Sequence, residues 1–260
     1  MSHIPRKRFG QNFLRDHGVI RHIVHAISPG SEEHLVEIGP GEGVLTAELL
    51  PHCGRLDAVE LDRDLVTSLT RRFAGQPRFH LHAADALSFD FTQLSAGKPL
   101  RIVGNLPYNI STPLMFWLFT QLDHVLDMHF MLQKEVVDRL CAAPGGKDYG
   151  RLSVMAAYYC QAESLFDVGP ESFHPPPKVV SSIVRLRPHP TPPVSVSHEA
   201  LGRIVTAAFS QRRKTLRNAL RDYFTESDFE HAQIDPGRRA ETLSLQEYAT
   251  LTEIGVRPHL

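Results

Sequence analysis

The chain has 260 residues, of which 42% are hydrophobic and 22% charged, as in globular proteins large enough to bury a core. This composition excludes collagen-like, coiled-coil and disordered chains, and the longest apolar stretch, 114–119, is far shorter than a membrane span of roughly 20 residues. The basic N-terminus has no apolar run behind it, so we expect no signal peptide. Three cysteines without metal-type spacing favour free thiols in a reducing cytoplasm.

Charge is unevenly distributed, although the formal net charge is only −1. Residues 31–100 contain 11 acidic and 6 basic residues, whereas residues 173–221 contain 9 basic residues and a single acid, Glu199. Residues 1–15 add four basic residues and no acid. Two basic segments around an acidic one indicate a polyanionic partner; a solvated surface without a ligand is the alternative interpretation.

Short apolar runs alternate with helical patterns along most of the chain. We expect helices at 44–50 and 64–73, and strands at 34–39, 56–60, 79–83, 100–104, 125–132, 164–168 and 179–186. This alternation is typical of an α/β fold with a parallel sheet and helices on both faces. Ligands of such sheets bind beyond the carboxyl ends of the strands, so we expect the functional site there.

A proline-rich segment at 188–193 interrupts the α/β pattern. The patterns that follow are helical, at 197–210, 214–224 and 244–254. We therefore expect two domains, an α/β domain at 1–188 and a small all-helical domain at 189–260.

A glycine loop follows the first of these strands, with glycines at Gly39, Gly41 and Gly43. Val44 occupies the position at which a dinucleotide loop needs its third glycine, and Pro40 has no N–H to offer a pyrophosphate. A nucleoside ligand without phosphates suits the loop better, and S-adenosylmethionine is the obvious one. A purely structural turn is the alternative.

Two acidic residues end the next two strands and could bind the same cofactor. Glu60 could accept hydrogen bonds from the ribose hydroxyls, and Asp85 from the exocyclic amine of the adenine. Asp62 and Asp64 are expected to cap the following helix.

The fourth strand ends in Asn105-Leu106-Pro107-Tyr108, which suits chemistry on an adenine amine. The lone pair of that amine is delocalised into the ring, so the amine is a poor nucleophile. The Asn105 side-chain oxygen and the Leu106 carbonyl could accept its two N–H bonds and favour a pyramidal nitrogen. Pro107 fixes the shape of the loop, and Tyr108 offers a ring for stacking. A plain turn with a half-buried tyrosine is the alternative.

Seven short motifs occur in order and together resemble the ribosomal RNA adenine N6-dimethyltransferases. They are Arg8-Phe-Gly-Gln-Asn-Phe-Leu14, Glu37-Ile-Gly-Pro-Gly41, Asn105-Leu-Pro-Tyr108, Leu132-Gln-Lys-Glu-Val136, Tyr149-Gly-Arg-Leu-Ser153, Phe173-His-Pro-Pro-Pro-Lys-Val179 and Phe209-Ser-Gln-Arg-Arg-Lys-Thr215. The resemblance covers nearly the whole chain and is closest to the bacterial small-subunit enzymes, which modify two adjacent adenines near the 3′ end of 16S rRNA.

The resemblance implies a Rossmann-like S-adenosylmethionine-dependent methyltransferase sheet and roles for particular residues. Gln11, Asn12 and Leu14 would close over the cofactor, which Gly39, Gly41, Glu60 and Asp85 would also contact. Asn105 would be shared between cofactor and substrate, and Phe173 would be the second stacking partner of the flipped adenine.

We expect the partner to be 16S rRNA within the small subunit and the protein to be a monomer. We expect no metal ion, because neither the pair His80 and His82 nor the pair His22 and His25 has a third ligand nearby. A helix around 211–217 would place Arg213 and Arg217 on one face, with Leu216 and Leu220 turned inward. The residues expected to bind RNA are Arg6, Lys7, Arg8, Lys178, Arg212, Arg213, Lys214, Arg217 and Arg221.

Three other functions remain open at this point. A DNA adenine methyltransferase would usually carry a target-recognition domain, which this chain lacks. A large-subunit rRNA methyltransferase is the nearest alternative, although Asn105-Leu-Pro-Tyr108 and the C-terminal Arg-Arg-Lys segment favour a small-subunit enzyme. A non-catalytic ribosome assembly factor would tolerate the loss of Asn105 or Glu60, and both are present.

Overall fold

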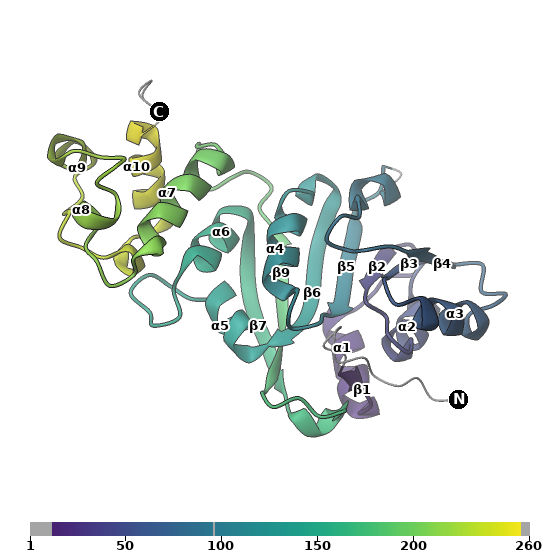
Figure 1. Cartoon of the computed structure of the whole chain (residues 1–260). Coiled ribbons are helices and arrows are strands. Elements are labelled where there is room, and N and C mark those ends of the chain that lie inside the picture. Colours follow the sequence, from purple (N-terminus) through teal and green to yellow (C-terminus); the bar gives the residue numbers. More distant parts are fainter. Residues whose placement is uncertain (1–11, 96, 256–260) are drawn as a thin grey trace. The chain divides into compact units, whose positions relative to one another are not determined.

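The expected strands lie in one seven-stranded sheet of the computed structural model, which describes residues 12–95 and 97–255. The strand order is β4-β3-β2-β5-β6-β9-β7 (Figure 1). Strands β2 to β6 are parallel as expected, whereas β9 is antiparallel to β6, so the sheet departs from the expected parallel arrangement at this edge. The strands are β2 (His34–Ile38), β3 (Arg55–Glu60), β4 (Phe79–Ala83), β5 (Leu100–Asn105), β6 (Val125–Gln133), β7 (Cys160–Val168) and β9 (Ser181–Pro188).

Helices cover both faces of the sheet because alternate strand residues point to opposite sides. On one face, Leu35, Leu56 and Val103 share a buried cluster with residues of α1 (His17–Ile27), α2 (Val44–Leu49) and α3 (Arg63–Arg72). Figure 1 shows α4 (Ser111–Phe119) over the strands from the near side. Asp62 caps α3 as expected, by accepting a hydrogen bond from the Asp64 N–H at 3.0 Å.

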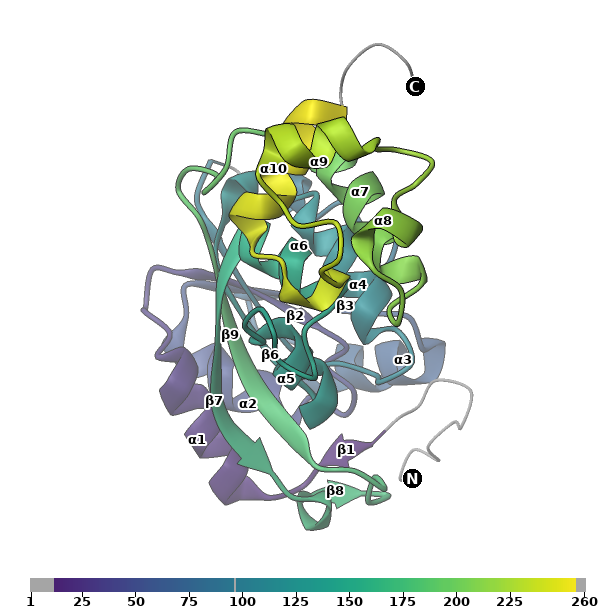
Figure 2. The ribbon, with the colours of Figure 1, turned by 90° about the vertical axis from the view of Figure 1, so that its left-hand side faces the viewer.

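A second, two-stranded sheet joins segments far apart in the sequence, and the apolar patterns did not predict it. Strand β1 (Phe13–Leu14) pairs antiparallel with β8 (Phe173–His174), so Leu14 lies opposite Phe173. Figure 2 shows the two strands side by side. Both Leu14 and Phe173 are buried in the cluster beneath α1, which anchors this sheet to the larger one.

The chain divides into two compact units whose boundaries differ from the expected 1–188 and 189–260. The first unit contains the described residues up to Val137 and Glu163–Pro188, and the second contains Asp138–Ala162 and the described residues from His189 onward. The segment 138–162 belongs with the second unit because its helix α6 (Arg151–Tyr159) contacts α7 (His198–Ser210) and α10 (Leu245–Gly255). Pro188 is nevertheless a boundary, as its sequence context predicts.

The second unit is mainly helical. The prediction of a helix over 214–224 is wrong, and so is the prediction of a continuous helix around 211–217. Helix α7 ends at Ser210, and α8 spans only Leu216–Ala219. The Leu216 and Arg217 N–H groups donate to the carbonyls of Arg238 and Pro236, which rules out the bonds to residues 212 and 213 that a helix requires. Leu216 and Leu220 are buried as predicted.

The remaining helices are short. They are α5 (Lys134–Leu140) and α9 (Glu226–Ala232), with 3₁₀ turns at Leu50–His52, Phe91–Leu94, Leu122–His124, Pro170–Ser172 and Ala240–Thr242. Within the described ranges, none of the helices is both long and apolar enough to cross a bilayer.

Candidate active site

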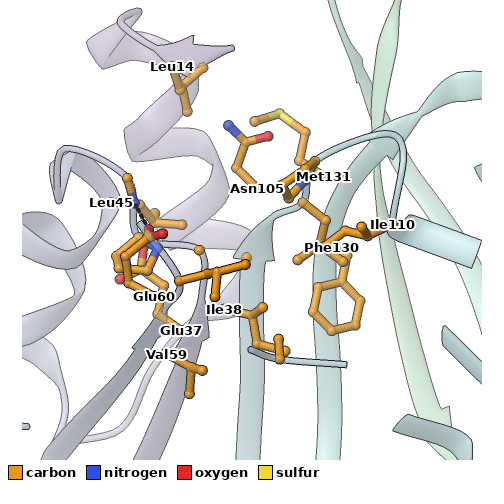
Figure 3. Close-up of a pocket in the computed structure, with 18 of the residues that line it drawn as sticks. Leu14, Glu37, Ile38, Leu45, Val59, Glu60, Asn105, Ile110, Phe130 and Met131 are labelled. Carbon is orange, nitrogen blue, oxygen red and sulfur yellow. Dashed lines mark hydrogen bonds between the residues drawn. The ribbon is translucent and has the colours of Figure 1, made fainter. Parts of the chain in front are cut away.

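A pocket opens at the carboxyl ends of β2, β3 and β5, where the sequence places the site (Figure 3). Its wall includes most of the residues expected to bind cofactor or substrate. These are Asn12, Leu14, Gly39, Gly41, Glu60, Asp85, Asn105, Leu106, Pro107 and Tyr108. The fold therefore brings together residues that lie up to 96 positions apart in the sequence.

The glycine loop forms one side of this pocket. Gly41 has a φ of 59°, a left-handed conformation that glycine adopts without strain. A Cβ at this position would lie 3.1 Å from the Phe13 ring, so a larger residue would require that ring to shift away from the loop. The Gly41 N–H donates to Glu60 at 3.3 Å, which ties the loop to the end of β3.

Glu60 lies at the base of the same wall and is 8% exposed. Its carboxylate accepts hydrogen bonds from the N–H groups of Asp62, at 2.9 Å, and Gly41. Burial raises the pKa of Glu60, although these backbone hydrogen bonds act in the opposite direction. Each carboxylate oxygen has a second lone pair, so the group retains acceptor capacity for a ligand. Asp85 is half-buried and accepts from the Leu87 N–H at 2.9 Å.

Glu37 is a second buried carboxyl in the pocket wall, to which the sequence assigns no role. It faces α2, where the Thr46 hydroxyl donates to it at 2.6 Å. Burial raises the pKa of Glu37 to about 7; the Thr46 hydrogen bond lowers it and the neighbouring Glu60 raises it further. Glu37 therefore changes charge near neutral pH inside the pocket wall.

The Asn105–Tyr108 loop forms the opposite side of the pocket. The Asn105 side-chain N–H₂ donates to the Asn12 carbonyl at 3.1 Å. The Tyr108 hydroxyl shares a 2.8 Å hydrogen bond with the Ser181 hydroxyl, and its half-buried ring lines the pocket. Leu106 is buried, and its N–H donates to the Met131 carbonyl. The loop is thus fixed to β6, β9 and the segment before β1.

The structure does not bring every expected residue to the pocket. Phe173 is 5% exposed, belongs to the core cluster and is absent from the pocket wall formed by the described residues. Gln11, Arg6, Lys7 and Arg8 lie outside the described residues. The stacking role of Phe173 and the contacts of these four residues stay predictions.

The other basic residues expected to bind RNA are exposed. Lys178 lies in the first unit, and Arg212, Arg213, Lys214, Arg217 and Arg221 lie in the second. Three of these arginines have acidic neighbours: Arg217 pairs with Glu226 at 2.6 Å, Arg221 with Asp222 at 3.6 Å and Arg212 with Glu241 at 4.0 Å.

His129 lines the inner part of the pocket and escaped sequence analysis because it lies inside an apolar strand. It is 3% exposed, and neither ring nitrogen has a hydrogen-bond partner among residues 12–95 and 97–255. Burial lowers the pKa of His129 to about 4, so the ring is neutral at physiological pH. No alternation signal distinguishes such a residue from its apolar neighbours.

Metal-ligating side chains do not gather near the pocket. Over the described residues there is no cluster of three or more His, Cys, Asp or Glu side chains arranged to hold a metal ion. His82 and His34 instead contact the buried carboxylate of Asp57, each at 2.6 Å.

Comparison with known proteins assigns the chain to a family. A sequence model of the family described as "Ribosomal RNA adenine dimethylase" matches residues 2–255. The chain belongs to the ribosomal RNA adenine dimethylase family. As a member of the rRNA adenine dimethylases, it is an rRNA adenine N6,N6-dimethyltransferase, and the resemblance noted in the sequence is confirmed.

Similar proteins cover nearly the whole chain. "Ribosomal RNA small subunit methyltransferase A" of Methylococcus capsulatus is 62% identical over 252 residues, covering 97% of this chain and 98% of that protein. The protein of the same name from Saccharophagus degradans is 56% identical, covering 96% of this chain and 94% of that protein.

Two solved structures share the fold of this dimethylase. A dimethyladenosine transferase from Plasmodium falciparum has a TM-score of 0.79 at 25% identity, covering 92% of this chain and 95% of that chain. The 23S rRNA methyltransferase ErmE has a TM-score of 0.71 at 26% identity, covering 94% of this chain and 99% of that chain. The expected α/β methyltransferase fold is therefore confirmed.

Proposed function

We propose that this dimethylase transfers methyl groups from S-adenosylmethionine to the N6 atoms of two adjacent adenosines in the 3′-terminal hairpin loop of 16S rRNA, within the small ribosomal subunit. One observation carries the proposal: a single pocket contains the glycine loop, Glu60, Asp85 and the Asn105–Tyr108 loop. The small-subunit target is supported by the 62% and 56% identical relatives, whose names state it.

The pocket wall fits S-adenosylmethionine. The left-handed Gly41 leaves its backbone open to close approach, and the Glu60 carboxylate can accept hydrogen bonds from the ribose. Asp85, at the next strand end, can accept from the adenine amine. When bound, the cofactor supplies an electrophilic methyl group on a sulfonium centre.

The Asn105–Tyr108 loop would activate the target amine. Asn105 donates to Asn12 through its amide nitrogen, so its Oδ1 remains the group that accepts a hydrogen bond from N6. With the Leu106 carbonyl accepting the second N–H, the nitrogen becomes pyramidal and its lone pair is exposed for attack. The Tyr108 ring would stack on the base once it has left the RNA stack.

The first unit is the proposed catalytic domain, and the second is the proposed RNA-binding domain. Many phosphate contacts are needed to hold folded RNA, and the exposed basic residues of the second unit can supply them. Ribosomal subunits mature in the cytoplasm, so we place the enzyme there, with a role in subunit biogenesis.

A charge-reversed triple variant tests the RNA-binding assignment. Changing Arg212, Arg213 and Lys214 to glutamate should abolish subunit binding and flatten its salt dependence, with cofactor affinity unchanged. The matched control reverses three exposed basic residues of the first unit, Arg63, Arg71 and Lys98. If the triple variant methylates subunits normally at physiological salt, the second unit is not the RNA anchor.

A large-subunit target is the second candidate, favoured by the TM-score of 0.71 against a 23S rRNA methyltransferase. The deciding experiment offers unmodified small and large subunits separately with S-adenosylmethionine labelled in its methyl group. We expect label on small subunits only, in two adjacent adenosines. Label on large subunits would favour the second candidate. No label on either, with subunit binding retained, would favour a non-catalytic assembly factor.

A further inference from the structure

Four consecutive residues, Asn12 to Arg15, contact two sides of the pocket and the β8 strand outside it. Asn12 accepts a hydrogen bond from Asn105, and the Phe13 ring lies against Gly41. Leu14 lies opposite Phe173 in the two-stranded sheet. The segment therefore bridges the glycine loop, the Asn105 loop and the β8 strand, which the chain itself separates by more than 60 residues at each step.

The contact with Asn12 decides which way the Asn105 amide faces. A backbone carbonyl oxygen can only accept, so the N–H₂ end of the amide must be the end that faces Asn12. In Figure 3, the Asn105 nitrogen lies on the side of Leu14 and its oxygen on the other side. A reversed amide would set two oxygens against each other at Asn12 and turn donors toward the target amine.

The position of the Asn12 carbonyl depends on how the segment is held. Its far end is fixed to the 3₁₀ turn just before β8, because the Arg15 N–H donates to the Ser172 carbonyl at 2.8 Å. A further attachment is an ion pair to the residue after Gly41, in which the Arg15 guanidinium lies 2.6 Å from the Glu42 carboxylate. Glu42 is itself held, since Arg72 donates to its backbone carbonyl.

We propose that Arg15 and Glu42 are positioning residues for methyl transfer: their ion pair holds the segment 12–15 in place, so that the Asn12 carbonyl keeps the oxygen of Asn105 turned toward the target amine. The proposal rests on the function proposed above and gives this residue pair a part in catalysis, whereas the sequence alone places Arg15 only among the basic residues of the N-terminal segment. It also links the glycine loop to the catalytic amide, because Glu42 follows Gly41 directly.

The expected effect is modest and falls on turnover. Arg15 is half exposed, with 50% of its side-chain surface accessible, and exposed ion pairs contribute little. We expect Arg15→Glu, which places two carboxylates together, to lower kcat about five-fold to tenfold. Arg15 also belongs to the basic segment 1–15, so the KM for the RNA substrate is measured beside kcat to separate positioning from RNA binding.

The test is a charge-swap cycle read by two methods. Arg15→Glu, Glu42→Arg and the double variant are compared in kcat and in affinity for S-adenosylmethionine. Arg21→Glu, on the exposed side of α1, is the matched control for the change of charge. The chain has four asparagines, so labelling with ¹⁵N-asparagine gives four side-chain amide signals, of which Asn105 is assigned by its loss in Asn105→Ala.

The two single variants should lower kcat and accelerate hydrogen exchange of the Asn105 side-chain amide, and the double variant should restore both. Arg21→Glu should change neither. An amide signal and a kcat that do not respond to the single variants, in an active enzyme, would overturn the inference. A fall in kcat without rescue in the double variant would also overturn it. An inactive native enzyme whose amide signal still follows the cycle would refute the proposed function and leave the positioning contact standing.

Discussion

Replacing the buried carboxyl of Glu37 by the amide in Glu37→Gln should make the free energy of unfolding less dependent on pH. Burial raises the pKa of Glu37 from 4.5 to about 7, so the folded protein holds a proton that the unfolded chain releases. The stability due to this proton is complete below pH 4.5 and is lost as the pH rises through 7. A shift of this size corresponds to about 3 kcal/mol over the whole range, of which roughly 2 to 3 kcal/mol falls between pH 5 and 8.

The assay is urea unfolding of the native protein and the variant at pH 5 and pH 8. Glutamine keeps an oxygen that can accept from the Thr46 hydroxyl, so the contact is retained while the charge is removed. The difference in unfolding free energy between variant and native protein isolates Glu37 from the other titrating groups. Glu253→Gln, at an exposed position of α10, controls for the loss of one carboxylate.

The variant should gain roughly 2 to 3 kcal/mol relative to the native protein on going from pH 5 to pH 8. A gain below about 0.5 kcal/mol would mean that Glu37 is ionised in the folded protein at both pH values. The carboxylate would then need a partner that compensates its burial, and the electrostatic description of the pocket wall would be wrong.

Glu60→Ala should weaken S-adenosylmethionine binding by about 1–3 kcal/mol, the loss of a charge-assisted hydrogen bond, as measured by isothermal titration. Unchanged affinity would make Glu60 a structural acceptor for Asp62 and Gly41. Asn105→Ala should lower turnover about 100-fold with little change in cofactor affinity, because its oxygen acts mainly in the transition state; normal turnover would refute that role. Between pH 7 and pH 4.5 the native protein should lose about 2 to 3 kcal/mol of stability through His129, because the unfolded chain binds a proton that the folded protein does not. His129→Phe should abolish this loss. An equal fall in the unfolding free energy of both proteins over this pH range would contradict the prediction.

The sequence predicts the parallel part of the sheet well, because buried strands such as His34–Ile38 and Leu100–Asn105 are short apolar runs between turn residues. It does not predict that β9 runs antiparallel, since strand direction depends on which partner the chain reaches. The helix expected over 214–224 failed for a related reason. The backbone carbonyls of Pro236 and Arg238 accept hydrogen bonds from the N–H groups of Arg217 and Leu216. The local helix propensity of 214–224 contains no information on this distant segment.

The sequence predicts those residues of the site that belong to short local motifs. The glycine loop, Glu60, Asp85 and Asn105 stand at strand ends, and parallel strands bring their ends together. The Asn12 contact with Asn105 spans 93 positions and depends on the two-residue pairing of β1 with β8, which is too short to leave a periodic pattern. His129 is hidden for the opposite reason, because it occupies a core position in which only its chemistry is unusual.

The strand order also determines when this protein can finish folding during its synthesis. Strand β9 is the last of the sheet to leave the ribosome, yet it lies between β6 and β7. Until Pro188 has emerged, β6 lacks its antiparallel neighbour, and β7 waits without the strand that attaches it to the sheet. Ser181, which holds Tyr108, belongs to the same late strand. A nascent chain stalled before residue 181 would thus carry the complete glycine loop and an unfinished catalytic wall, with an open strand edge that invites pairing with other chains.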